Sequence, residues 1–178
     1  MANEFTYQVL KDTTEHAVIK LTGKWDSASQ EDNPNRISAN SLYGALNTDG
    51  GLLSVSGSAL PYYGLTIHRI WYDTYNGAGG DLELYWNANP TVTLMLLSGN
   101  SEYDGAGNWV TIPNAAYGAE GVSECNGDIG IKTRGYSANT SYTIVLELRK
   151  QNEYYQRGQL NDPAAFNYGV YSITPHTS

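Results

Sequence analysis

The chain contains a single cysteine, Cys125, among its 178 residues. One thiol cannot form a disulfide within the chain or a thiolate metal cluster, so a disulfide-stapled or zinc-organised fold is excluded. Long apolar runs are also absent, since the longest comprises the four residues from Leu94 to Leu97. The first residues lack the basic and apolar stretches of a secretory signal. We therefore expect neither a membrane-spanning segment nor a cleaved secretory leader.

Basic residues are missing from the middle of the sequence. No Lys or Arg lies between Arg69 and Lys132, and the acidic residues of this stretch match the net charge of −8 carried by the whole chain. These acids are Asp73, Asp81, Glu83, Glu102, Asp104, Glu120, Glu124 and Asp128. Because binding to a phosphate backbone requires several cationic side chains, the sequence predicts no nucleic-acid partner. An acidic surface of this kind favours solubility.

The residues that are present are typical of a folded, β-rich protein. Apolar residues make up 40% and charged residues 16% of the chain, which excludes a disordered or coiled-coil protein. Several segments alternate polar and apolar residues with a period of two, and this pattern predicts half-buried strands. The expected strands span residues 5–9, 17–22, 65–72, 81–86, 92–97, 109–112, 128–133 and 141–148.

Stretches rich in Gly and Asn separate these strands at residues 76–80 and 99–108, and both residue types suit tight reversals. Amphipathic helices of the length that a βαβ unit needs are missing. We therefore expect an all-β fold, a jelly-roll-like antiparallel β-sandwich of about eight strands connected as a meander. Long loops are expected at 26–35 and 47–60, and at most one short helix at 40–46.

The C-terminal part departs from the alternating pattern. We expect a β-sandwich domain over residues 1–150 and an irregular arm over residues 151–178. Tyrosine is enriched at protein interfaces, so the aromatic residues of this arm pack either on their own sandwich or on a partner subunit. The candidate partner-binding residues are Tyr154, Tyr155, Arg157, Phe166, Tyr168 and Tyr171.

Residues that could support catalysis are scattered along the chain. The three histidines, His16, His68 and His176, share no helix face or strand face, as a zinc site would require. Glu83 and Glu147 lie inside expected strands, where the alternation turns them towards solvent rather than across a glycosidase cleft. We predict no catalytic residue, no cofactor and no metal. A structural calcium ion at the 104–108 loop is a lesser alternative.

Four segments carry a resemblance to a known family. They are LTGKWDSASQEDNPNRISANSLYGAL (21–46), LPYYGLTIHRIWYD (60–73), SYTIVLELRK (141–150) and YYQRGQLNDPAAFNYG (154–169). Together they resemble uncharacterised virion structural proteins of tailed bacteriophages, particularly those of marine cyanobacteria. The resemblance implies a component of the virus particle rather than an enzyme, and it supplies no catalytic residues.

The resemblance and the expected fold lead to a functional hypothesis. Small sandwich proteins of phages resemble capsid decoration or cement proteins, which bind junctions between major-capsid subunits and stabilise the head. The expected partners are the major capsid protein or other virion proteins, together with further copies of this chain in a homo-oligomer such as a trimer. Two alternatives remain open: a structural protein of the neck, tail or fibre, and a carbohydrate-binding module. The module would use Trp25, Trp71, Trp86 or Trp109 as stacking platforms.

Overall fold

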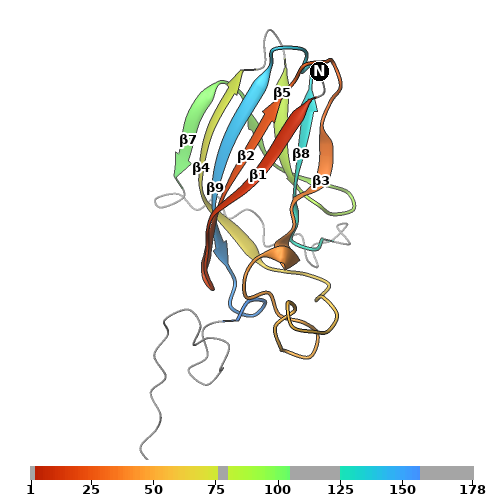
Figure 1. Ribbon diagram of the computed structural model, residues 1–178, viewed down its shortest axis with the longest axis vertical. Coiled ribbons are helices and arrows are strands. Elements are labelled where there is room, and N and C mark those ends of the chain that lie inside the picture. Colours follow the sequence, from red (N-terminus) through yellow and green to blue (C-terminus); the bar gives the residue numbers. More distant parts are fainter. Residues whose placement is uncertain (1–2, 76–79, 105–124, 157–178) are drawn as a thin grey trace, which may run out of the picture.

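The computed structural model describes residues 3–75, 80–104 and 125–156, which form two antiparallel β-sheets packed face to face (Figure 1). Sheet A has the strand order β1-β2-β9-β4-β7, and sheet B has the order β3-β8-β5-β6. The strands are β1 (Glu4–Asp12), β2 (His16–Lys24), β3 (Asp32–Ile37), β4 (Leu65–Tyr75), β5 (Asp81–Trp86), β6 (Val92–Leu97), β7 (Asn100–Asp104), β8 (Ile129–Arg134) and β9 (Ser141–Lys150). The expected all-β sandwich is confirmed.

The expected meander is wrong, because among the described strands the sequence neighbours that also pair are β1 with β2 and β5 with β6. β9 instead lies at the centre of sheet A, where Leu146 pairs with Ile19 of β2 on one side and with Ile70 of β4 on the other. Turn residues predict where a strand ends, but which strands pair with each other depends on how many of their side chains must be buried. β9 buries four consecutive inward side chains, and a strand of that kind is stabilised most at a central position.

Two strands occupy segments that were expected to be loops or turns. β3 lies at the edge of sheet B, and its register shifts between Asn33 and Ile37, around Pro34. Proline has no backbone N–H to donate, so an edge position is the place where a strand tolerates it. β7 forms the edge of sheet A opposite to β1, and Tyr103 is its least exposed residue. Such short, polar edge strands lack the alternation that identifies half-buried ones.

Where at most one short helix was expected, at 40–46, the structure has a 3-10 turn at Ala39–Ser41 (η1). Leu42 and Ala45 are buried, and Ala45 forms an isolated β-bridge with Tyr155 instead of continuing a helix. The strand expected at 109–112 lies outside the described residues.

The core lies between the two sheets and is unusually rich in aromatic rings. The inward rows of β2, β9, β4, β5 and β8 are fully or almost fully buried. At one end, the buried Trp25 ring packs against Tyr136 and Tyr142, with ring centroids 4.6 and 5.6 Å apart. At the other end, Tyr63 and Tyr155 pack 5.7 Å apart. Aromatic pairs at these centroid distances stabilise a fold by more than the burial of their surface alone, so ring packing stabilises both ends of the core.

This tyrosine-rich core predicts alkaline sensitivity. Burial is the main cause that raises the pKa of six described tyrosines, and it raises that of Tyr62 to about 12. The six are five buried tyrosines of the core, Tyr62, Tyr85, Tyr136, Tyr142 and Tyr155, together with the partly exposed Tyr7 of β1. Above about pH 10 the unfolded chain loses these phenolic protons first, so the folding stability falls as the pH rises. Burial lowers the pKa of Lys150, which acts in the opposite direction but is one group against six.

We expect the melting temperature, followed by circular dichroism, to fall progressively between about pH 9 and 11. The variant Tyr62→Phe removes one of the titrating groups and is expected to show a shallower decline. A melting temperature that stays constant or rises over this range would contradict the assignment of the five buried tyrosines to the folded core.

Candidate functional site

The first candidate site is an apolar row on the edge strand of sheet A. Phe5, Tyr7 and Val9 of β1 are 40, 41 and 45% exposed, and Leu10, at a β-bulge, is 50% exposed. We call these four residues the β1 stripe. Large apolar side chains that remain uncovered in a contiguous row are typical of a protein contact surface.

The stripe is covered only in part. Its row pairs with Gly23, Leu21 and Ile19 of β2, and the Leu21 and Ile19 side chains are completely buried while their β1 neighbours are not. The Phe5 ring packs edge-on against Trp25 at 5.1 Å, and the Arg36 guanidinium of β3 lies 5.8 Å from the Phe5 ring centroid. Arg36 also donates hydrogen bonds of 2.9 and 3.1 Å to the carbonyl oxygens of Thr6 and Thr22.

The outer edge of β1 is open as well. In the described part of the chain no strand pairs with it, and Figure 1 shows β1 as the outermost strand of sheet A. A long edge strand with unpaired backbone groups is a ready site for another chain to pair. The stripe and the open edge therefore offer apolar and hydrogen-bonding contacts on one strand.

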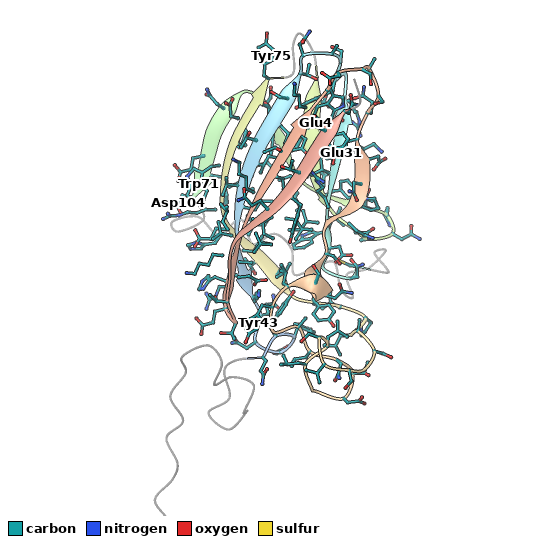
Figure 2. The ribbon with its side chains drawn as sticks, in the orientation of Figure 1. Glu4, Glu31, Tyr43, Trp71, Tyr75 and Asp104 are labelled. Carbon is teal, nitrogen blue, oxygen red and sulfur yellow. The ribbon has the colours of Figure 1, made fainter. Side chains whose placement is uncertain are left out.

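The second candidate site is a hollow of about 430 Å³ on the outer face of sheet A, which we call the Trp71 hollow. Strand register explains its composition. One cross-strand row consists of Val145, Trp71 and Glu102, and the adjacent row consists of Thr143, Asp73 and Asn100. The lining is completed by Tyr72 and Ser101. Figure 2 shows Trp71 and Asp104 at the β7 side of the sheet.

The charges around this hollow are mainly negative. Asp73 and Glu102 line it, and the lining includes no Lys or Arg. Two cations lie beside it: Lys20 of β2 pairs with Val145 in the same cross-strand row, and the Arg69 guanidinium lies 5.9 Å from the Trp71 ring centroid and 3.1 Å from a carboxylate oxygen of Asp104. Since β-strand side chains alternate, Arg69 and Asp73 flank Trp71 on the same face. Arg69 thus contacts the indole from the side opposite the polar row.

Tyr155, one of the predicted partner-binding residues, does not lie on the surface. Tyr155 is completely buried, and its hydroxyl donates a 2.8 Å hydrogen bond to the carbonyl oxygen of Ala39. The prediction that Tyr155 binds a partner is therefore wrong, because the ring belongs to the core. Tyr154 is half-buried and packs edge-on against Tyr62 at 5.0 Å. Arg157, Phe166, Tyr168 and Tyr171 lie outside the described residues.

The first residues of the expected arm pack on the sandwich, which is one of the two alternatives that the sequence left open. The amide of Gln151 donates a hydrogen bond to Gly64, and the amide of Gln156 donates one to Gly44. The segment 151–156 is therefore held on the sandwich. The sequence could not decide this because the segment does not alternate and these partners are distant in the chain.

A buried ammonium group ties this end of the molecule together. The Lys150 side chain is fully buried, and its Nζ donates hydrogen bonds to an Asp12 carboxylate oxygen and, at 2.7 Å each, to the carbonyl oxygens of Thr13 and Tyr43. The Tyr155 ring lies 5.1 Å from the same nitrogen. The contacts join β9, the β1–β2 hairpin and the loop after η1.

The other residues considered for chemistry do not converge. Glu83 is paired with Arg134 on sheet B, and Glu147 lies 3.6 Å from His68 on sheet A, so the two carboxylates are on different sheets. Within residues 3–75, 80–104 and 125–156, no three His, Cys, Asp or Glu side chains gather as metal ligands would. Trp25 and Trp86 are buried and cannot stack on a ligand, whereas Trp71 is half-buried. Trp109 lies outside the described residues.

The geometry defines a two-sheet β-protein with two candidate binding surfaces. Comparison of the chain with protein-family models, curated proteins and solved structures finds no match in any of the three. None of the described segments is a helix long and apolar enough to cross a membrane.

Proposed function

We propose that this protein is a non-catalytic structural protein of a phage particle that decorates the capsid and stabilises the head by binding junctions of the major capsid protein. The observation that carries the proposal is the β1 stripe with its open strand edge. A closed aromatic core supplies the rigid scaffold that such a protein needs, and the stripe supplies apolar contacts to a neighbouring subunit.

The tyrosine-rich arm starts beside the same surface. Asp12, the last residue of β1, accepts a hydrogen bond from the amide of Tyr43, and Gly44 next to it accepts one from Gln156. Gln156 therefore lies close to the Asp12 end of β1. Arg157, Phe166, Tyr168 and Tyr171 extend the proposed contact surface, and a homo-oligomer such as a trimer would multiply weak contacts into durable attachment.

The variant Tyr7→Asp tests the role of the stripe. A charge at the centre of an apolar contact must be desolvated without a partner, so we expect the amount of protein bound to purified particles to fall by at least about tenfold. The matched control is Leu96→Asp, which places the same charge at a 60% exposed strand position of sheet B. Binding is measured by co-sedimentation with particles that lack the protein.

Equal binding of both variants would contradict the assignment of the stripe as the contact surface. The location in the particle is tested separately by quantitative mass spectrometry of purified virions. A decoration protein is expected at a copy number of the same order as the major capsid protein. A handful of copies would place the protein in the neck, tail or fibre instead.

A further inference from the structure

The lining of the Trp71 hollow combines a half-buried indole with carboxylate, amide and hydroxyl groups, and the contacts proposed for the β1 stripe do not involve these residues. It lies on β4, β7 and β9, whereas the β1 stripe lies on the opposite edge of sheet A. We propose that the Trp71 hollow is a binding site for a neutral oligosaccharide. This inference rests on the hollow alone and does not depend on the proposed function.

The arrangement of the two cross-strand rows carries the proposal. The indole of Trp71 and the side chain of Val145 provide an apolar row, and Thr143, Asp73 and Asn100 provide a polar row about 6.6 Å further along the strands. A sugar ring has a face of C–H groups and a rim of hydroxyls. Such a ring lying on the indole would direct its hydroxyls to the polar row.

The polar side chains suit hydroxyl groups in particular. Each hydroxyl both donates and accepts hydrogen bonds, and the carboxylates of Asp73 and Glu102 accept them while Asn100 and Thr143 can do both. A ligand that has hydroxyls can pair with several of these groups at once, which favours it over an apolar ligand that displaces their water without replacing its hydrogen bonds.

Charge narrows the ligand class further. Anionic glycans and phosphates are disfavoured, since two carboxylates line the hollow and no cation does. Arg69 lies against one side of the indole and is paired with Asp104, so the lining remains acidic and a cationic peptide is the competing ligand, which the test below includes. The apolar row, together with the hydrogen-bonding groups of the polar row, favours a neutral sugar.

The length of the surface indicates more than one sugar unit. Tyr75 is 68% exposed and follows Asp73 on the same face of β4, four residues and about 13 Å from Trp71. Figure 2 shows Tyr75 at the upper end of β4, beyond Trp71. Two aromatic rings that flank a polar row would hold successive units of a short chain.

The test uses the full-length protein and an array of neutral oligosaccharides of glucose, mannose, galactose and xylose, followed by calorimetric titration of the best binder. We expect binding that does not change with ionic strength, since the ligand carries no charge. Trp71→Ala is expected to raise the dissociation constant at least about tenfold, because the stacking platform is lost. Asp73→Asn is expected to raise it several-fold.

The control variant is Leu96→Ala, an exposed apolar residue of the opposite sheet, which is expected to bind as the unmodified protein does. If Trp71→Ala does not fold, Trp71→Phe and Asp73→Asn carry the test, with folding checked by circular dichroism. A silent array overturns the proposal. Unchanged binding in the Trp71 and Asp73 variants does so as well, and so does binding of a lysine-rich peptide with no binding of sugars.

Discussion

The variant Lys150→Met is expected to lower the free energy of unfolding by about 3 kcal/mol. The substitution keeps the volume of the buried side chain but leaves the Asp12 carboxylate, which is only 18% exposed, without its cation. Removing one partner of a buried ion pair is strongly destabilising, because the other charge stays buried. The carbonyl oxygens of Thr13 and Tyr43 also lose their donor. The measurement is urea unfolding followed by tryptophan fluorescence.

Two further variants separate this explanation from a general effect of removing charge. The double variant Lys150→Met, Asp12→Asn is expected to recover part of the loss, since no uncompensated charge then remains. Arg134→Met breaks a pair with Glu83 in which the arginine side chain is 60% exposed. Such a pair contributes less than about 1 kcal/mol. A Lys150→Met loss no larger than that of Arg134→Met would contradict the structural role of the buried ammonium group.

Truncation of the C-terminus is expected to give two opposite results, depending on the position of the cut. A chain that ends at Lys150 loses Tyr155, and removing a fully buried aromatic side chain costs about 3–5 kcal/mol. It also loses the backbone hydrogen bonds of residues 151–156 to Gly44, Leu46 and Gly64. Since total stabilities are about 5–15 kcal/mol, this chain is expected to be largely unfolded at ordinary temperature.

A chain that ends at Gln156 keeps all of these contacts. Its unfolding free energy is expected to lie within about 1 kcal/mol of the full chain, because the described core is complete. If residues 157–178 contribute to the contact surface, this shorter chain binds particles more weakly while remaining folded. Equal stability of the two truncated chains would contradict the placement of Tyr155 in the core.

The fold class could be predicted from the sequence because it depends on local alternation. The segment 81–86 alternates and the segment 92–97 is apolar except for Thr93, and both are strands with the expected bounds. The strand order could not be predicted in this way. It depends on pairings such as Leu146 with Ile19 and Ile70, which join distant parts of the chain and leave no local signal.

The candidate sites were predicted less completely, and for the same reason. Alternation places Phe5, Tyr7 and Val9 on one face, but it does not show that these side chains stay 40 to 45% exposed. Trp71 was among four tryptophans considered for stacking, and only its neighbours across β7 and β9 distinguish it. Tyr155 was expected at a surface because an irregular segment carries no pattern that distinguishes a buried ring from an exposed one.

The most direct measurement is an electron-microscopy map of the purified particle at a resolution that shows side chains. A capsid decoration protein that binds through β1 is expected on the outside of the shell, at repeated junctions between major-capsid subunits. Phe5, Tyr7 and Val9 should there be buried against a neighbouring subunit. A map in which the protein occupies the shell with this row facing solvent, or in which the protein is missing from the shell, would contradict the proposed function.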